Sequence, residues 1–367
     1  VSGTSNLGAN VTTSGTQTYS DAVTLSANVT LTTTDNGNIT LNDTINGDYN
    51  LTISTHGTGD TTFTEAVGGT AALNNISIST DVLTAAAIKA DGTLSVTNLN
   101  ASTISGIISQ GTALALTKAG AGSLTLSAAN TFTGDTTISA GDLAIGGSGQ
   151  LGGGSYGGAI SIATGSTFTY ASSANQTITG VISGAGDLEK TTSTTSTLTL
   201  SGDNTYSGGT TVSAGYLQSG SSSGASPPTS GPFGTATVTV ASGAVLDLNG
   251  QTVGNAINLS GTGISAGGAI INSSATAATI SGNITLAAHS SIGGTNNVTI
   301  SGIISGDAKN LTKVGSSTYT LNNTNTYTGD TTISAGTVKL TGTLDSATDL
   351  IIATGATLDL QNTQTVA

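Results

Sequence analysis

Apolar and polar residues alternate with a period of two along nearly the whole chain. Early examples are Ala22 to Leu25, Val29 to Thr32 and Ile76 to Ser79. Such alternation predicts short β-strands with one buried face. Gly, Asn and Asp separate the runs, as in Asp35-Asn36-Gly37, and accept the left-handed backbone that tight corners need. The segment Val82 to Ala90 contains three consecutive alanines but is short and uncapped, so we predict a strand or a corner there too.

Two sequence patterns recur together along the chain. A twelve-residue pattern reads NTFTGDTTISAG at 130–141, NTYSGGTTVSAG at 204–215 and NTYTGDTTISAG at 325–336. A six-residue pattern precedes each copy, as ISGIIS from Ile104, ITGVIS from Ile178 and ISGIIS from Ile300. Because the two patterns move together, they mark internal repeats. The copies of the six-residue pattern are 74 and 122 residues apart, and a solenoid coil of about 24 residues fits both spacings.

The spacing of the repeats distinguishes between the all-β folds that are compatible with a period of two. A sandwich or an up-and-down barrel would not tolerate insertion of whole coils, whereas a β-solenoid would. We therefore predict an all-β solenoid, an elongated rod of stacked coils with no helix longer than about two turns. The residues that superpose between repeats are expected to point into the core: Leu124, Leu126, Ile138, Leu198, Leu200, Val212, Leu321 and Ile333.

The solenoid divides into two continuous regions by its repeats. Residues 1–103 carry no full copy of the twelve-residue pattern, and residues 104–367 carry all three copies. The segment Ser219 to Pro232 contains all three prolines and no apolar run. We predict that this segment forms a surface loop outside the stack.

Composition and charge exclude several classes of partner. Charged residues make up 7% of the chain, the net charge is −13, and the six basic residues are all lysines. Nucleic acids and anionic membrane surfaces need clustered cations, so we predict neither as a partner. No apolar run is long enough for a transmembrane helix, so we predict no membrane insertion of this segment. The absence of cysteine removes disulfide and thiol chemistry.

Candidate catalytic residues are few. His56 lies in a polar stretch typical of a turn, without the surroundings of a catalytic triad. The six lysines mostly occupy matching repeat positions, and we interpret them as charges that solubilise the edge of a coil: Lys89, Lys118, Lys190, Lys309, Lys313 and Lys339. The carboxylates, including Glu65 and Glu189, are scattered mostly beside Gly or Asn, which favours turns over the paired acids of a glycosidase.

Ligand sites receive little support from the sequence either. The glycine-rich stretch Gly146 to Gly158 contains no Asp and so does not fit a calcium-binding nonapeptide roll. Threonine pairs such as Thr136-Thr137 recur only with the long repeat, so we rank ice binding below adhesion. We predict no enzymatic activity and no catalytic, cofactor or metal site.

The third repeat carries a family resemblance. Leu311-Thr312-Lys313-Val314-Gly315, Tyr319 to Leu321, the twelve-residue pattern and Val338 to Leu340 resemble the autotransporter-associated β-strand repeat of bacterial passenger domains. Leu116 to Gly120 opens the first copy in the same way, whereas Leu188 to Thr191 lacks the glycine after the lysine. Residues 9–100 look more like the repeats of filamentous-haemagglutinin-type large adhesins. The resemblance implies a right-handed parallel β-helix, export across the outer membrane and a surface or secreted location.

These observations predict a secreted or cell-surface structural or adhesive protein, the scaffold of an autotransporter-like exoprotein. The alternatives are a self-assembling extracellular filament or surface-layer subunit and, with less support, a β-helix enzyme acting on polysaccharides. The expected partners are a surface glycan or protein receptor. We also expect end-to-end self-association, because the first and last coils show no capping element.

Overall fold

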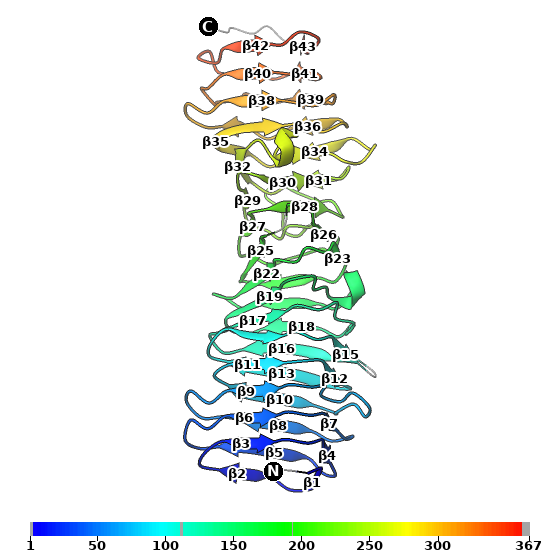
Figure 1. Ribbon diagram of the computed structural model, residues 1–367. Coiled ribbons are helices and arrows are strands. Elements are labelled where there is room, and N and C mark those ends of the chain that lie inside the picture. The colour runs from blue at the N-terminus through cyan, green and yellow to red at the C-terminus, as the bar shows by residue number, and fades with distance from the viewer. Residues whose placement is uncertain (1–2, 111–112, 193, 362–367) are drawn as a thin grey trace. The chain divides into compact units, whose positions relative to one another are not determined.

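The computed structural model describes residues 3–110, 113–192 and 194–361. These residues form short parallel strands that stack coil upon coil, so the prediction of an all-β solenoid is confirmed (Figure 1). In the described ranges the helical elements are two three-residue 3-10 turns, η1 Gly152–Gly154 and η2 Ile264–Ala266. The chain divides into two compact units, Val1–Gln176 and Thr177–Ala367, called unit 1 and unit 2 below. The division by repeat type into residues 1–103 and 104–367 stays a prediction.

Unit 1 is built from strands of two to six residues. They are β1 Ser5–Leu7, β2 Val11–Thr13, β3 Gln17–Tyr19, β4 Val23–Leu25, β5 Val29–Thr33, β6 Ile39–Leu41, β7 Ile45–Asn46, β8 Leu51–Ser54, β9 Thr61–Phe63, β10 Ile76–Thr80, β11 Leu83–Ala85, β12 Ile88–Ala90, β13 Thr93–Asn98, β14 Ser102–Ile104, β15 Ile108–Gln110, β16 Ala115–Ala119, β17 Ser123–Leu126, β18 Thr136–Ile138, β19 Asp142–Ile145, β20 Ser155–Tyr156, β21 Ile160–Ile162 and β22 Thr167–Tyr170.

The strands of unit 1 fall into parallel stacks. The first runs β2-β5-β8-β10-β13-β16-β18-β21, and the second runs β3-β6-β9-β11-β14-β17-β19-β22. A third, shorter stack contains β1-β4-β7 and the pair β12-β15. The segment Val82 to Ala90 contributes one strand to each of the last two stacks, as expected for a strand and a corner.

Unit 2 begins within β23. Its strands are β23 Gln176–Ile178, β24 Ile182–Gly184, β25 Asp187–Lys190, β26 Thr197–Leu200, β27 Thr210–Val212, β28 Gly215–Ser219, β29 Val238–Val240, β30 Ala244–Asp247, β31 Thr252–Val253, β32 Ile257–Gly261, β33 Ile270–Ile271, β34 Ala278–Ile280, β35 Ile284–Ile292, β36 Val298–Ile300, β37 Ile304–Ser305, β38 Leu311–Lys313, β39 Thr318–Leu321, β40 Thr331–Ile333, β41 Thr337–Leu340, β42 Leu350–Ile352 and β43 Thr357–Leu360. One parallel stack is β25-β27-β29-β32-β35-β38-β40-β42, and another is β31-β34-β36-β39-β41-β43.

The coils are not of uniform length. Ile76 pairs with Leu94 in the next coil, whereas Gln218 pairs with Asp247, so the second of these coils is clearly the longer. The uniform coil that the repeat spacing suggests is therefore an average and not a structural constant. Corners absorb the difference, because strand pairing fixes the register of the coils but leaves the length of their connections free.

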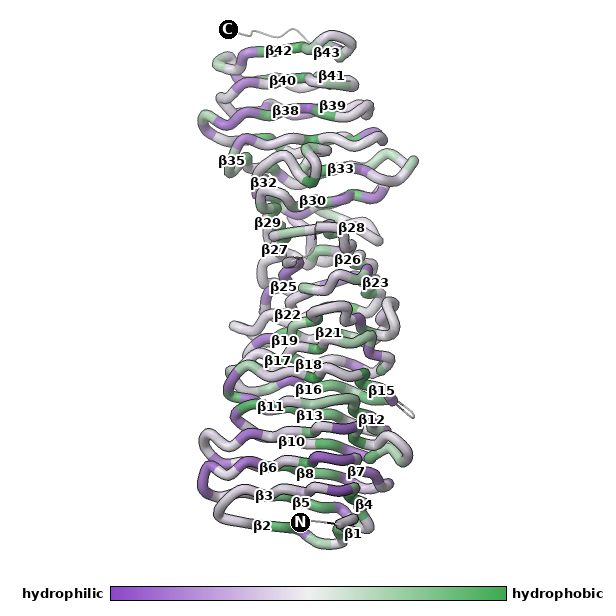
Figure 2. The backbone as a smooth tube through the Cα atoms, viewed as in Figure 1, coloured by the Kyte–Doolittle hydropathy of each residue, from purple (hydrophilic) through white to green (hydrophobic). Residues whose placement is uncertain are grey.

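The core of each unit is a set of columns of inward-facing aliphatic side chains. Burial alternates along the strands, and Figure 2 shows hydrophobic stretches on strands such as β5 and β8 with hydrophilic stretches at the corners. All eight residues predicted to point inward are at most 1% exposed. The register prediction is therefore confirmed, because a slip by one residue would have turned these side chains outward.

The proline-containing segment is not exposed throughout. Ser222 and residues 224–227 are exposed, whereas Pro228 and Pro232 are buried. The backbone N–H of Ser223 donates to the carbonyl of Thr252 at 2.8 Å, which ties this part of the segment to the neighbouring coil.

Core burial leads to a test with a matched control. Leu126 is fully buried and lies between Ile104 and Ile145 in the adjacent coils. We expect Leu126→Asp to lower the free energy of unfolding by roughly 3 kcal/mol or more, because the carboxylate would have no charged partner there. Thr125→Asp, on the outward side of the same strand, should change it by less than about 1 kcal/mol. Urea unfolding of both variants would refute the assigned register if the two midpoints agreed.

Candidate functional site: the buried polar contacts of the repeats

The first residue of the twelve-residue pattern is an asparagine that joins adjacent coils. In each copy its side chain is at most 1% exposed, and its Oδ1 accepts the backbone N–H of the fifth residue of the preceding six-residue pattern. The pairs are Asn130 with Ile108 at 2.8 Å, Asn204 with Ile182 at 2.7 Å and Asn325 with Ile304 at 3.0 Å. This contact gives a physical reason why the two patterns occur together in the sequence.

The amide nitrogen of the same asparagine binds backbone carbonyls. Asn130 Nδ2 donates to Ala128 O at 2.8 Å and to Gln150 O, in the following coil, at 3.1 Å. Asn325 Nδ2 donates in the same way to Asn323 O at 3.0 Å and to Thr343 O at 3.1 Å. Each of these side chains thus connects three successive coils, which an aliphatic residue could not do.

The third position of the pattern supplies a buried hydroxyl. Tyr206 Oη lies 2.6 Å from Thr210 Oγ1, and Tyr327 Oη lies 2.5 Å from Thr331 Oγ1. The first copy has Phe132 at this position, and no hydroxyl comes from the pattern itself.

A tyrosine from another coil replaces the missing hydroxyl in the first copy. Tyr156 Oη lies 2.7 Å from Thr136 Oγ1 and also donates to the carbonyl of Gly134. Its ring packs edge-on against Phe132, with centroids 5.8 Å apart. The glycine-rich stretch Gly146 to Gly158 therefore contributes Tyr156 as a core side chain.

Three of the six lysines are buried, contrary to the prediction that they solubilise a coil edge. Lys118, Lys190 and Lys313 are at most 1% exposed. Lys118 lies in register with Val96 and Ile138, so it occupies a column of inward-facing aliphatic residues. The other three lysines are partly exposed: Lys89, Lys309 and Lys339.

The buried ammonium groups bind backbone carbonyls at a corner. Lys118 Nζ donates to the carbonyls of Ala119, Gly120 and Ala140 at 2.7, 2.8 and 3.0 Å, which uses all three of its N–H groups. Lys313 Nζ makes the equivalent contacts at 2.7, 2.9 and 3.3 Å: Val314, Gly315 and Ala335. The long aliphatic stem fills the core column while the charge reaches the turn.

The glycine after the lysine allows this turn. Gly120 and Gly315 have φ of +77° and +71°, and a Cβ at Gly120 would approach the carbonyl oxygen of Asn98 to 2.3 Å. In the second copy Thr192 takes the corresponding place with φ of +52°. There Lys190 Nζ contacts the carbonyls of Thr191 and Thr192 at the longer distances of 3.2 and 3.3 Å.

A signal for the buried lysines was present in the sequence. Leu116 and Lys118 are two residues apart in a period-2 strand, so they share a face. The alternation therefore favours an inward lysine, against the general rule that charged side chains lie outside. The cost of burial is offset because every N–H of the ammonium group of Lys118 has a carbonyl partner.

The remaining candidate residues show no catalytic arrangement. His56 is exposed, and His289 Nδ1 accepts the N–H of Asn310 at 3.0 Å. The buried carboxylate of Asp247 accepts from Gln218 Nε2 at 2.8 Å and from Ser273 Oγ at 2.6 Å, so it has a structural partner on each side. Within the described ranges, no group of three His, Asp or Glu residues could hold a metal ion.

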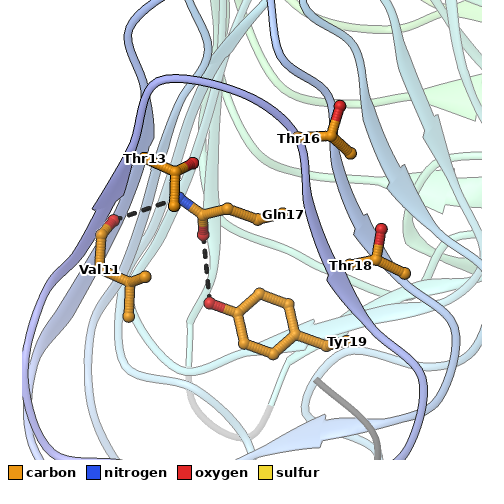
Figure 3. Close-up of a pocket in the computed structure, with 6 residues that line it drawn as sticks. All are labelled: Val11, Thr13, Thr16, Gln17, Thr18 and Tyr19. Atoms are coloured by element: carbon orange, nitrogen blue, oxygen red, sulfur yellow. Dashed lines mark hydrogen bonds between the residues drawn. The ribbon is translucent and has the colours of Figure 1, made fainter.

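A pocket of about 180 Å³ lies in the first coil, against β2 and β3 (Figure 3). Gln17 Nε2 donates to Val11 O at 3.3 Å, and Tyr19 Oη donates to Gln17 Oε1 at 3.1 Å. The other lining residues carry only hydroxyl groups: Thr13, Thr16 and Thr18. Burial raises the pKa of Tyr19, so this pocket offers no group that would transfer a proton at neutral pH.

Comparison with known proteins matches the repeats to a described family. The family model described as the passenger-associated transport repeat matches residues 116–145, 195–218 and 311–340. Each match contains one copy of the twelve-residue pattern, and the second begins after Lys190, where the sequence departs from the other copies. The resemblance of residues 9–100 to filamentous-haemagglutinin-type repeats stays a prediction.

A curated relative covers a larger part of the chain. The adhesin BmaC autotransporter of Brucella suis biovar 1 (strain 1330) is 31% identical over 264 residues, which is 62% of this chain and 7% of that protein. The chain thus spans a small fraction of the length of the curated relative that it matches. No solved structure matches the chain. Among the residues described, no helix has the length and hydrophobicity needed to cross a membrane.

The buried lysines predict a rise of stability with pH. Burial lowers the pKa of Lys118, Lys190 and Lys313 to about 8, although Asp142 acts in the opposite direction on Lys118. The unfolded chain keeps these protons up to about pH 10.4, so it binds more protons than the folded chain between the two values. The free energy of unfolding should therefore rise from about pH 8 to about pH 10 and lose this contribution as the pH falls through about 8.

The upper limit of this rise is set by tyrosines. Burial raises the pKa of Tyr156 to about 12, and it raises the pKa of Tyr206, Tyr319 and Tyr327 as well. The unfolded chain loses phenolic protons first, so stability should fall above about pH 10. Urea midpoints measured from pH 7 to 11 would test both limbs. In Lys118→Met/Lys313→Met the rising limb should shrink, and an unchanged rise would show that these lysines do not cause it.

The contribution of the Tyr156 hydroxyl to stability can be tested by transferring this hydroxyl from position 156 to position 132. Tyr156→Phe should lower the free energy of unfolding by about 1 to 2 kcal/mol, because Thr136 and Gly134 O lose a buried partner. Phe132→Tyr alone should also destabilise, because its hydroxyl would compete with Tyr156 for the same space. The double variant places the tyrosine at the third position of the pattern, as in the other two copies. It should recover most of the lost free energy of unfolding. Additive effects in this double-mutant cycle would contradict the shared position of the hydroxyl.

Proposed function

We propose that this chain, which carries three passenger-associated transport repeats, is a stretch of the passenger of an autotransporter-like exoprotein. It acts as the β-helical scaffold of an adhesive protein at the bacterial cell surface or in secreted form. The observation that carries this proposal is that each matched segment contains a buried asparagine, whose Oδ1 accepts a backbone N–H of the preceding coil, and a buried aromatic ring two residues later. The 31% identity to an adhesin autotransporter supports the adhesive role.

A structural rather than an enzymatic role fits the use of the polar groups. The buried ammonium groups bind backbone carbonyls, and the buried carboxylate of Asp247 binds Gln218 and Ser273. Groups held in this way cannot reach a substrate. The comparisons do not favour a filament subunit or a polysaccharide-acting enzyme.

The partners proposed for this scaffold are a surface glycan or a protein receptor, together with end-to-end association of copies. The net charge of −13 supports the absence of nucleic acid and anionic membrane among the partners. Sedimentation across a concentration series measures self-association directly, and a constant sedimentation coefficient would argue against it.

Surface display tests the scaffold and adhesive roles together. The chain is fused to an outer-membrane anchor in a non-adherent Gram-negative host, with the anchor alone as control. We expect externally added protease to remove the chain from intact cells, and attachment to glycan-coated or protein-coated surfaces to exceed that of the control. A chain that is retained inside the cell would count against the passenger role. Surface exposure without increased attachment would limit this stretch to a scaffold.

A further inference from the structure

The outward face of the first stack in unit 1 carries two columns of hydroxyl residues that follow the register of the strands. The first column follows the register of β5 to β21 as Thr30, Thr52, Ser77, Ser95, Thr117, Thr137 and Ser161. The second lies two residues further along each strand as Thr12, Thr32, Ser54, Ser79 and Thr97. Hydroxyl pairs therefore occur in successive coils outside the long repeat, contrary to the sequence interpretation.

Four successive coils contribute a complete pair to this face, which we call the hydroxyl lattice. Its members are Thr30 and Thr32, Thr52 and Ser54, Ser77 and Ser79, and Ser95 and Thr97. No register shift interrupts these pairings. Neighbouring strands of a sheet lie about 4.8 Å apart, and two residues along a strand span about 6.6 Å, so the lattice is periodic in two directions.

The hydroxyl lattice is uncharged and its polar groups are free. None of its eight members is ionisable, although the chain as a whole carries a net charge of −13. Across the described residues, no hydroxyl of the lattice makes a hydrogen bond within the protein. The threonines carry a methyl group each and have few side-chain rotamers, so holding them in one arrangement costs little entropy.

We propose that the hydroxyl lattice binds the surface of ice. Ice is a neutral ligand whose water molecules repeat at fixed spacings in two directions, as the hydroxyl groups of the lattice do. A regular array of free hydroxyl groups with neighbouring methyl groups can order a first layer of water that continues into the crystal. Each contact is weak, but the contacts act together because the coils hold them in one register.

The same face is poorly suited to other partners. Sugar rings bind to concave sites that combine aromatic side chains with a few polar groups, and the lattice consists only of serine and threonine. The cores of protein interfaces are enriched in aromatic residues, methionine and arginine, which the lattice also lacks. Its neutrality matches a neutral crystal better than it matches a charged polymer.

Partitioning into ice tests the proposal on the complete 367-residue chain. The chain is mixed with slowly growing ice, and its concentration is compared between the ice and the remaining solution. Recrystallisation in frozen sucrose films provides a second readout. We expect the chain to enter the ice and to slow crystal coarsening relative to a non-binding protein of similar size and charge. Exclusion of the chain from ice, with no effect on coarsening, overturns the proposal and leaves the proposed passenger role untouched.

Variants on two faces of the same unit locate the binding surface. Thr52→Lys/Ser77→Lys places two long charged side chains in the middle of the lattice and should abolish partitioning. The matched control is Thr62→Lys/Thr84→Lys in the second stack, where outward threonines form one column: Thr18, Thr40, Thr62, Thr84, Thr103 and Thr125. The control should partition like the parent. Equal losses in both variants, with unchanged melting curves, would refute the assignment to the hydroxyl lattice.

A gain of function completes the test. Ser77→Thr/Ser79→Thr/Ser95→Thr adds the missing methyl groups and stiffens three side chains, so it should increase partitioning and recrystallisation inhibition above the parent. A decrease would contradict the proposed contribution of the methyl groups. Sedimentation of the chain with insoluble cellulose or chitin, lost in Thr52→Lys/Ser77→Lys but without ice binding, would assign the face to a polysaccharide and overturn the proposal.

Discussion

Hydrogen bonds between successive coils hold the whole structure together. Backbone N–H groups pair with the carbonyls of a neighbouring coil at corners as well as along strands, for example Ser26 with Leu7 at 2.9 Å and Ser334 with Lys313 at 2.8 Å. Because neighbouring coils lie only about 4.8 Å apart, a corner has no room for side chains that point along the stack. At Gly122 an added Cβ would approach the carbonyl oxygen of Asn100 to 2.4 Å. The length of the coils varies at the corners, while strand pairing keeps the register from coil to coil along most of the stack and shifts it at the irregularity between Leu259 and Gly261 of β32.

The buried polar side chains supply hydrogen-bond donors to backbone carbonyls at the corners. Carbonyls that turn toward the core need donors, and short side chains supply them in many coils, as Thr33 does for Gly37 at 2.6 Å and Asn272 for Thr276 at 2.7 Å. In the repeats a lysine reaches the same kind of corner from a position in the aliphatic column. Burying an ammonium group is costly, but three carbonyls compensate it at Lys118. Such a group specifies one corner geometry, which an aliphatic side chain would not.

Because the buried polar groups bind other groups of the protein, binding of partners is left to the outer surface. The buried lysine, asparagine and tyrosine groups of the repeats, which could perform chemistry in another fold, bind backbone and hydroxyl partners here. The outward positions are free to vary, because they contribute little to the register of the stack. A scaffold of this kind can present different surfaces along its length. That fits both an adhesive passenger and an uncharged lattice on one stack of unit 1.

The sequence by itself determined the strands, the inward aliphatic positions and the solenoid, because a period of two and the whole-coil repeats can be read directly from the order of the residues. Leu124 and Leu126 could be assigned to the core from alternation alone, and both are buried. Only the tertiary structure decided the partners of the polar residues, since these depend on which coil lies above and below. Lys118 binds Ala140 across 22 residues, and Tyr156 supplies a hydroxyl to Thr136 that Phe132 lacks. The columns of hydroxyl residues on unit 1 likewise became visible only in the register of the coils. Because the coils differ in length, no fixed sequence period could have revealed that register.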